Sequence, residues 1–329
     1  MRAVTVADGA LAVREHPDPE PGRGELLVRV AAAGVNGADQ AQLRGYYPAP
    51  PGSPADIPGL ELAGEVAALG PGTSRFRVGD RVMAVVGGGG QAELAVVHER
   101  LAMPVPDTLG LVQAGGFPEV VTTAHDALFT QCGLGLGDRL LVTGAAGGVG
   151  TAAVQLGAAA GARVVASARN RDHHAALAEL GAERVVEPHE VAGAGPFDVV
   201  LELVGAPGFK ANFDALASRG RVMVIGVGAG TRVELDLRVL MARRGRVLGS
   251  QLRNRQLEEK ADAARRVEAQ VLPLVEAGRL RIPVAATFPL PDAVGAYERF
   301  AAAGKLGKVV LLMRDLPGPG PAPGRGPGA

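Results

Sequence analysis

The chain has 329 residues, which at about 100–200 residues per domain predicts two domains. Its hydrophobic content of 47% is enough for large buried cores, and its formal net charge of zero argues against a nucleic-acid surface or an anionic membrane as partner. Aromatic residues make up only 3%, so a base-stacking platform is not expected.

A single cysteine, Cys132, excludes an internal disulfide and a cysteine-based zinc site. No apolar run reaches the roughly 18 residues that a membrane span needs. The N-terminus also lacks the long apolar stretch of a signal peptide. We therefore expect a cytoplasmic protein without membrane contact.

The first third of the chain is predicted to be all-β, because runs rich in β-branched residues alternate with Gly- and Pro-rich turns. Strands are expected at 25–32, 61–69 and 81–86. After Pro118 strands alternate with helices: strands are expected at 138–143, 163–167, 184–187, 197–204 and 221–225, and helices at 148–160 and 172–180. This alternation predicts a parallel sheet with helices on both faces.

Three further elements complete the predicted domains: a strand at 245–252, a helix at 256–276 and a strand at 308–313. The last segment, 316–329, consists almost entirely of Gly, Pro, Ala and Arg. It cannot bury enough apolar surface to offset its ordering entropy, so we expect a disordered tail.

A glycine-rich turn, Gly144–Gly150 (GAAGGVG), follows the first strand of the alternating region and opens a helix. Glycines let backbone N–H groups approach a pyrophosphate, and the helix N-terminus adds partial positive charge. The spacing is Gly-x-x-Gly-x-x-Gly rather than the usual Gly-x-Gly-x-x-Gly, and a purely structural turn is the alternative. Its place between strand and helix favours a dinucleotide site, with expected contacts at Gly144, Ala145, Gly147, Gly148 and Val149.

The end of the next strand indicates which dinucleotide binds. NAD enzymes usually place Asp or Glu there, about 20 residues after the turn, for the ribose 2′-hydroxyl. Here the segment 166–171 reads ASARNR, with Ser167, Arg169 and Arg171 and no acid before Asp172. Because arginine matches phosphate geometry, we expect NADPH, with its 2′-phosphate held by these residues. A solvated charged loop is the alternative.

None of the three tyrosines has a lysine four residues further on, which excludes a short-chain dehydrogenase mechanism. The β-rich start, the alternating centre and the return to strands resemble the medium-chain dehydrogenase/reductase superfamily. So do the segments 33–39 (AGVNGAD), 58–64 (PGLELAG) and 78–82 (VGDRV). The resemblance implies an α/β fold: a GroES-like β-rich catalytic domain (1–120 and 267–315) with a Rossmann NADPH-binding domain (121–266).

Two positions depart from the zinc-dependent alcohol dehydrogenases of this superfamily. Asn36 stands where those enzymes carry a cysteine ligand, and Leu60 stands where they carry a histidine. The cysteine-rich structural zinc lobe is also missing. Neither Asn nor Leu can replace such ligands, so we expect no metal.

The remaining motifs resemble the zinc-free NADPH:quinone oxidoreductases, and among them the stress-inducible quinone reductases. The segments that carry this resemblance are Asn36–Gly52, Gly88–Ala92, Pro118–Ala124, Leu252–Arg255 and Gly304–Lys308. The similarity extends over residues 1–314. It implies hydride transfer from NADPH to a quinone or an α,β-unsaturated carbonyl compound.

The resemblance also implies site residues. Tyr47 is placed at the cleft, as a hydrogen-bond donor to a developing oxyanion or as an anchor only. Asn36 is placed near the nicotinamide and the acceptor, and Thr123 in contact with the cofactor. The alternative for Tyr47 is a loop tyrosine that covers apolar surface, and for Asn36 an ordinary Asn-Gly turn.

Other positions are expected around the same cleft. Gln91 follows a four-glycine loop and is expected to line the cleft, unless the loop is a simple flexible turn. Leu252, Arg253 and Arg255 are expected to close over the cofactor, with surface arginines as the alternative. Lys308 is expected to help position the cofactor region, and Cys132 is expected to be inert.

Two other functions stay open at this stage. An enoyl reductase would use the same chemistry with a different pocket, and a non-catalytic NADPH-binding protein would bind the cofactor without turnover. The resemblance further implies a homodimer, joined edge to edge through the apolar run 246–252, since an uncovered edge strand seeks a partner.

Overall fold

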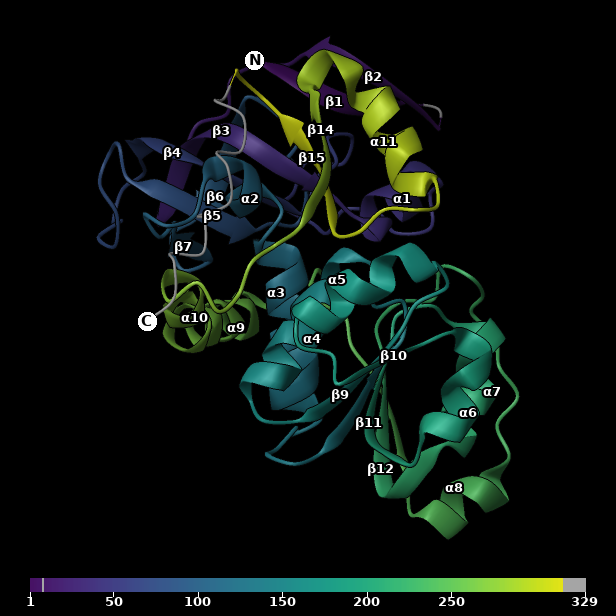
Figure 1. The fold of residues 1–329 in the computed structure, drawn as a ribbon. Helices are drawn as coiled ribbons and strands as arrows, with labels where there is room; N and C mark the ends of the chain where they lie inside the picture. The colour runs from purple at the N-terminus through teal and green to yellow at the C-terminus, as the bar shows by residue number, and fades with distance from the viewer. Residues whose placement is uncertain (8, 316–329) are drawn as a thin grey trace.

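The computed structural model describes residues 1–7 and 9–315 (Figure 1). A β-rich part built from both ends of the chain lies above a helix-covered parallel sheet in this view. No helix within the described residues is both long and apolar enough to cross a membrane. The tail predicted to be disordered, 316–329, lies outside the described residues.

Strands from both ends of the chain form one seven-stranded sheet. Its members are β3 (Glu25–Val35), β4 (Glu61–Leu69), β5 (Arg81–Val85), β6 (Leu94–His98), β7 (Ala102–Pro104), β14 (Val284–Pro289) and β15 (Lys308–Leu312). The order is β14-β15-β3-β4-β5-β7, with β6 paired to β3. Because β15 runs antiparallel to β3, with Val310 opposite Gly34, the C-terminal strands complete the N-terminal sheet.

Smaller elements cover this sheet. The strands β1 (Arg2–Ala7) and β2 (Ala10–Glu15) form a separate antiparallel pair. Helix α11 (Ala293–Ala301) follows the short helix η4 (Leu290–Asp292) and packs on β14, β15 and β2. Its buried residues Ala293, Ala296 and Tyr297 join the core between the strands, because they recur at helical spacing.

The central region forms a six-stranded parallel sheet. Its strands are β8 (Arg139–Val142), β9 (Arg163–Ser167), β10 (Arg184–Val186), β11 (Phe197–Glu202), β12 (Leu216–Val224) and β13 (Arg246–Gly249). Their order is β10-β9-β8-β11-β12-β13. Numbered from β8, this is 3-2-1-4-5-6, the order of dinucleotide-binding folds, and it confirms the predicted α/β class.

Both faces of the parallel sheet are buried. Leu140 and Val142 of β8 belong to one apolar core and Leu141, between them, to another. The covering helices are α4 (Gly148–Ala159), α5 (His174–Glu179), α6 (Val191–Ala194), α7 (Ala206–Asp214) and α8 (Leu237–Arg243), with short helices η2 (Arg171–His173) and η3 (Pro188–Glu190). This double burial explains why the strands read as continuous apolar runs rather than alternating ones.

The first third is not all-β as predicted. It contains α1 (Gly37–Leu43), whose first turn is closed by Asp39, which accepts a hydrogen bond from the Asn36 N–H at 2.8 Å. Helices α2 (Leu111–Gly115) and α3 (Pro118–His125) follow the strands, and α3 continues as a π-helix, η1 (Asp126–Gln131). Hydrophobic periodicity does not predict α1, because a helix of only two turns is too short to show a repeating apolar pattern.

The predicted helix at 256–276 is two helices, α9 (Leu257–Gln270) and α10 (Leu272–Glu276). Pro273 ends the continuous pattern, since it has no N–H to donate. The predicted strand at 245–252 is limited to β13, and the predicted helix at 172–180 begins as η2.

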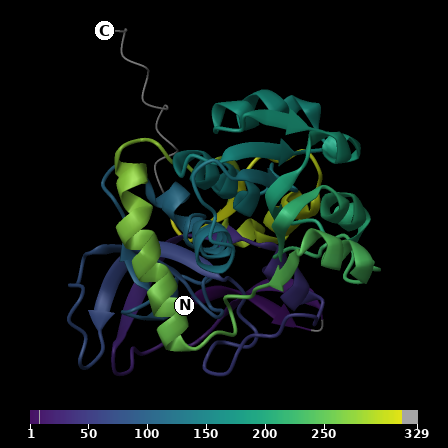
Figure 2. The ribbon, with the colours of Figure 1, turned by 90° about the horizontal axis from the view of Figure 1, so that it is seen from below.

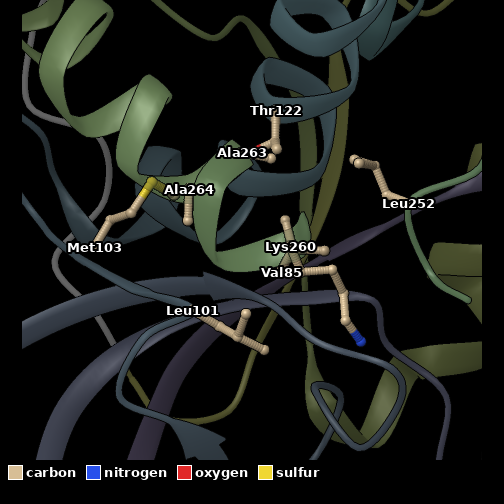
Figure 3. Close-up of a pocket in the computed structure, with 8 residues that line it drawn as sticks. All are labelled: Val85, Leu101, Met103, Thr122, Leu252, Lys260, Ala263 and Ala264. Atoms are coloured by element: carbon tan, nitrogen blue, oxygen red, sulfur yellow. The ribbon is translucent and has the colours of Figure 1, made fainter. Parts of the chain in front are cut away.

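Helix α9 packs against both α3 and β7, and lies along the β-rich part in Figure 2. Its residues Lys260, Ala263 and Ala264 line a pocket of about 10 Å³ together with Thr122 and Leu252 (Figure 3). A cavity of this size holds one water at most, so it is a packing feature and not a ligand site.

The predicted domain boundaries fall inside helices. The boundary at 120/121 lies in α3, and the boundary at 266/267 lies in α9. Both helices therefore run from one predicted domain into the other, and the division into 1–120 with 267–315 and 121–266 stays a prediction.

Candidate functional site

The predicted phosphate-cradling turn connects β8 to α4. Gly144 has a φ of +56°, in the left-handed region that favours glycine. A Cβ on Gly150 would lie 2.6 Å from the Gly144 oxygen, and a Cβ on Gly148 would lie 2.7 Å from the Lys308 Cδ. Glycine is therefore required at these positions to keep the turn tight and close to β15.

The N-terminus of α4 carries unpaired donors. Gly147 is the N-cap and provides no side-chain cap, and the first helical bond runs from the Thr151 N–H to the Gly147 oxygen at 2.8 Å. The N–H groups of Gly148, Val149 and Gly150 therefore lack helical partners. With the helix dipole they fit a pyrophosphate, so the residues present suit the dinucleotide that the fold implies.

The residues expected around the 2′-phosphate separate in the structure. Ser167 lies against the turn, since its carbonyl accepts a hydrogen bond from the Ala145 N–H at 3.1 Å. Arg169 is exposed and lies near Lys305, whose pKa is lowered by burial first and then by neighbouring cations that include Arg169. Arg171 instead forms an ion pair with Glu187. Arg169 is thus the freer guanidinium of the two.

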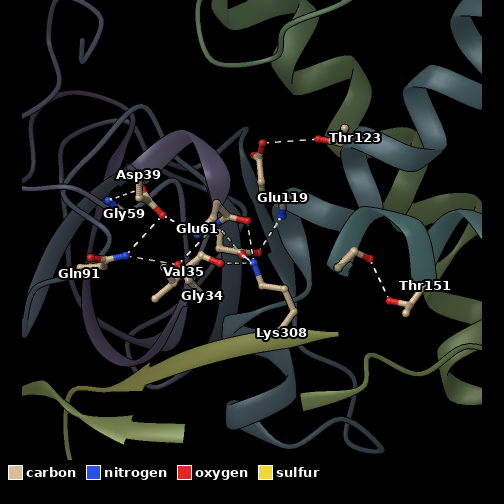
Figure 4. A network of polar contacts seen from close by, with 12 residues as sticks. Gly34, Val35, Asp39, Gly59, Glu61, Gln91, Glu119, Thr123, Thr151 and Lys308 are labelled. Carbon is tan, nitrogen blue, oxygen red and sulfur yellow. Dashed lines mark hydrogen bonds and ion pairs between the residues drawn. The ribbon is translucent and has the colours of Figure 1, made fainter. Parts of the chain in front are cut away.

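Lys308, at the start of β15, lies at the centre of a buried polar network (Figure 4). Its ammonium is 2.7 Å from the Glu61 Oε1, and the two side chains are 2% and 0% exposed. It also donates to the Val35 carbonyl at 3.0 Å and to the Asn36 Oδ1 at 2.6 Å. The Asn36 Nδ2 donates to the same Glu61 oxygen at 2.9 Å. Both ends of the Asn36 amide are therefore engaged in holding this ion pair.

Asp39 fixes the neighbouring loop. It accepts hydrogen bonds from the Asn36 N–H at 2.8 Å and the Gly59 N–H at 3.0 Å, and burial raises its pKa to about 7. Gln91 is 0% exposed and its Oε1 accepts a hydrogen bond from the Tyr297 hydroxyl at 2.8 Å. Gln91 therefore supports the site from inside the protein and does not line the cleft as predicted.

Glu119 stands in the first turn of α3. Its N–H donates to the Glu61 Oε2 at 2.9 Å, and its Oε1 accepts a hydrogen bond from the Thr123 hydroxyl at 3.5 Å. Figure 4 shows its carboxyl group pointing toward Thr123. Burial, followed by the charge of Glu61, raises the pKa of Glu119 to about 8, which favours the protonated form of this carboxyl at neutral pH.

Tyr47 is held by Arg253. The guanidinium carbon lies 5.1 Å from the centre of the Tyr47 ring, and the guanidinium donates to the Tyr47 carbonyl at 2.7 Å and to the Gly87 carbonyl at 2.7 Å. Arg253 is 2% exposed and positions Tyr47, and its predicted closure over the cofactor stays a prediction. Burial raises the pKa of the half-buried Tyr47 phenol, which keeps it a hydrogen-bond donor.

Two other residues of the predicted cofactor loop are also engaged within the protein. Arg255 forms an ion pair with Asp126 at 2.7 Å, and Leu252 lines the small apolar pocket beside α9. Their predicted closure over the cofactor stays a prediction. Cys132 is buried, and burial raises its pKa to about 11, which agrees with the inert thiol that we expected.

The two positions at which zinc-dependent alcohol dehydrogenases carry metal ligands, Asn36 and Leu60, have other roles in this structure. Leu60 is buried hydrocarbon, and Asn36 is committed to Lys308 and Glu61. Within residues 1–7 and 9–315, no group of three or more His, Cys, Asp or Glu side chains is arranged to hold a metal ion.

A groove of about 520 Å³ lies beside the Tyr47 loop. Arg253 forms part of its wall and contacts Tyr47. Segments 50–54, 86–89 and 253–257 and the side chain of Lys260 supply further wall. Its wall includes neither Tyr47, Glu119 nor the Gly144–Gly150 turn, so the groove adjoins the site described above without being part of it.

Four residues of the network carried no predicted role: Asp39, Glu61, Glu119 and Tyr297. The sequence does contain a signal for the acids, because Glu61 stands between Leu60 and Leu62 in an apolar strand. A carboxylate in such a run requires a buried partner. What the pattern does not reveal is that the partner is Lys308, which lies at the other end of the chain.

Comparison with known proteins agrees with this architecture. Residues 22–131 match the family described as alcohol dehydrogenase GroES-like domain, and residues 148–269 match the family described as zinc-binding dehydrogenase. Quinone oxidoreductase of Rattus norvegicus is 30% identical over 306 residues, which cover 90% of this chain and 91% of the relative. Prostaglandin reductase-3 of Bos taurus is 38% identical over 238 residues, 68% of this chain and 61% of the relative.

Solved structures give the same result. A mycobacterial protein in complex with NADPH superimposes with a TM-score of 0.86 at 28% identity, and the match covers 95% of this chain and 100% of that one. Similar structures also include an NAD-dependent alcohol dehydrogenase. The shared fold therefore binds a nicotinamide dinucleotide. With a GroES-like part, a dinucleotide-binding sheet and quinone oxidoreductases among its relatives, the chain belongs to the medium-chain dehydrogenase/reductase superfamily of oxidoreductases.

Proposed function

We propose that this protein is a zinc-independent, NADPH-dependent reductase that transfers a hydride to a quinone or a related electron-poor carbonyl compound. The observation that carries the proposal is the close contact at Gly148. There the start of α4, which has no side-chain cap, packs against Lys308 of the buried Lys308–Glu61 ion pair. The turn would hold the pyrophosphate of a dinucleotide beside this ion pair.

NADPH rather than NADH is supported by the end of β9. Arg169 is exposed there, Lys305 lies near it, and no acid occupies the strand end. An acid at this position would repel a 2′-phosphate, whereas a guanidinium binds it through charge-assisted hydrogen bonds.

The reduced nicotinamide supplies the hydride, and the protein orients it and stabilises charge on the acceptor. The N–H groups of Gly148 and Val149 would bind the pyrophosphate. Tyr47, fixed by Arg253, donates a hydrogen bond to the acceptor oxygen as negative charge develops there.

Zinc independence rests on the donor set. Asn36 and Leu60 offer no ligand that suits catalytic zinc, which needs three protein ligands and an open position. In this proposal hydrogen-bond donors replace the metal as the group that polarises the acceptor.

The test is NADPH consumption by chelator-treated protein with a panel of ortho- and para-quinones and simple enones, repeated with NADH. Quinone turnover that prefers NADPH and is unchanged by chelator is expected. Tyr47→Phe is expected to lower kcat by about 10²-fold, the usual effect of losing one oxyanion donor. Quinone turnover that requires added zinc would contradict the proposal.

A second candidate function is favoured by the likeness to prostaglandin reductase-3. In this case the acceptor is the double bond of an enone, and turnover is confined to the enones of the panel. Cofactor binding without turnover on any acceptor would instead indicate a non-catalytic NADPH-binding protein. We further propose a homodimer in the cytoplasm, and its interface is treated at the scale of the whole molecule below.

A further inference from the structure

Glu119 has a carboxyl oxygen that the protein leaves without a partner. Its Oε2 is enclosed and makes no hydrogen bond within the described residues, while its Oε1 accepts only the long bond from Thr123 at 3.5 Å. A partly buried carboxylate with so few donors would be destabilised, whereas a carboxylic acid presents an O–H group to donate. The environment of Glu119 therefore fits the acid form.

The charges around Glu119 act in the same direction. Glu61 and Asp39 face it with negative charge, and the ammonium of Lys308 is already shared between Glu61 and Asn36. On the other side, the titratable neighbours of Glu119 are Tyr47 and Arg253. The Arg253 guanidinium donates hydrogen bonds to three oxygens, which belong to the Gly87 carbonyl, the Tyr47 carbonyl and the Gln42 side chain. The charge of Lys308 lowers the pKa of Glu119, but burial and the charge of Glu61 outweigh this effect and raise the pKa to about 8.

Glu119 also stands where the two halves of the site meet. The next residue, Val120, would lie 2.8 Å from a Cβ on Gly148, so the phosphate-cradling turn packs directly against the start of α3. The start of α3, where Glu119 stands, would therefore border a cofactor held on the turn.

We propose that Glu119 is the proton donor that completes the reduction, and this inference rests on the proposed function. The acceptor receives a hydrogen with its electron pair from C4 of the reduced nicotinamide, so the acceptor is reduced by two electrons and the nicotinamide is oxidised. The anion so formed takes the proton from the Glu119 O–H. Glu119 is left as a carboxylate and regains a proton from water once the product has left.

The test is Glu119→Gln, which keeps the shape of the neutral acid and removes its proton. The expected loss in kcat is about 10²-fold or more, in the range of general acid catalysis. The wild-type rate should fall as pH rises through about 8, because only the acid form donates, and the variant should lose this limb of the profile. Glu298→Gln, on the exposed face of α11, is the matched control and should leave rate and profile unchanged.

A second readout needs neither cofactor nor turnover. Infrared difference spectra of the cofactor-free protein should show a protonated carboxylic acid at pH 7 that titrates near pH 8 and is absent from Glu119→Gln. Asp39→Asn identifies the contribution of the other carboxyl with a raised pKa. Thermal unfolding checks that the variants fold.

The outcomes separate the two proposals. A wild-type enzyme that turns over quinones, with a Glu119→Gln variant of equal rate and unchanged pH profile, overturns the donor role and leaves the proposed function standing. A wild-type protein without turnover on any acceptor overturns the proposed function itself, and the donor role with it, whatever the infrared band shows.

Discussion

Arg169 and Arg171 illustrate how neighbouring side chains of one type acquire different roles. Both follow β9 and were equally good candidates for the 2′-phosphate by sequence. In the structure Arg171 is paired with Glu187, whereas Arg169 has no acidic partner within the described residues. A guanidinium already bound to a carboxylate has less to gain from a phosphate, so the two arginines should contribute unequally.

We therefore expect Arg169→Ala to raise KM for NADPH by roughly ten- to hundredfold, since hydrogen bonds to charged groups contribute about 1.5–3 kcal/mol. The KM for NADH should hardly change, because NADH has no 2′-phosphate. Arg171→Ala should have a smaller effect, and Arg184→Ala, an exposed arginine on β10, serves as the neutral control. Equal losses for both cofactors would place Arg169 away from the 2′-phosphate.

The buried carboxyls make stability depend on pH in a defined direction. Asp39 and Glu119 have their pKa values raised to about 7 and about 8 from ordinary values of 3.8 and 4.5. The native state therefore binds more protons than the unfolded state within this window, and its stability falls as pH rises through it. The full contribution is present below about pH 4 and is lost above about pH 8.

Denaturant unfolding of wild type, Asp39→Asn and Glu119→Gln between pH 5 and pH 8.5 checks this expectation. Each substitution should flatten the decline by up to about 1.4 kcal/mol per pH unit, because it removes one titrating proton. Parallel curves for wild type and both variants would show that neither group titrates with a raised pKa.

At the scale of elements, the β8–α4 turn depends on the absence of side chains. Backbone atoms of Gly144 and Ala145 occupy the space beside Gly150. They lie 2.6 Å from the position that a Cβ on Gly150 would take. Backbone cannot move aside as a flexible side chain can. The sequence motif is therefore a packing requirement as well as a phosphate-binding pattern.

Gly150→Ala is expected to lower both NADPH affinity and the unfolding temperature, even though alanine favours helix by about 1 kcal/mol over glycine. Gly193→Ala in α6 is the matched control, because a Cβ there meets nothing within 4 Å. It should be neutral or slightly stabilising. Isothermal titration with NADPH and thermal unfolding provide the two measurements, and unchanged affinity for Gly150→Ala would mean that the turn has room to relax.

At the scale of the whole molecule, the parallel sheet ends in an open edge. β13 pairs with β12 on one side, and around it Leu237, Met241 and Val247 are 64%, 75% and 40% exposed. An edge strand with apolar neighbours is a surface that a second strand covers. This supports the proposed homodimer, in which two such edges meet.

Met241→Glu combined with Val247→Glu should convert the dimer to a monomer, because dimerisation would bury two charges per chain without partners. Sedimentation velocity of wild type and variant measures the change. Leu136→Glu, which alters a side chain that is 87% exposed in the turn before β8, is the control and should stay dimeric. A monomeric wild type at micromolar concentration would remove the proposed interface.

The sequence by itself determined most of the architecture and the cofactor class. Local signals were enough for this: β-branched runs, the strand–turn–helix at Gly144–Gly150 and the strand end at Arg169 each act over short distances. Local signals also produced the errors, since α1 is too short for periodicity and Pro273 divides a pattern that otherwise continues.

Only the tertiary structure decided which side chains act together. Asn36, Glu61, Glu119 and Lys308 come from the start, the middle and the end of the described chain, and they meet because β15 pairs with β3 beside the turn. The burial of each carboxyl and the charges around that carboxyl then determine which one keeps a proton. Both depend on neighbours that are distant in sequence. For the same reason Gln91 was expected to line the cleft and is instead fully buried, because exposure is a property of the folded molecule.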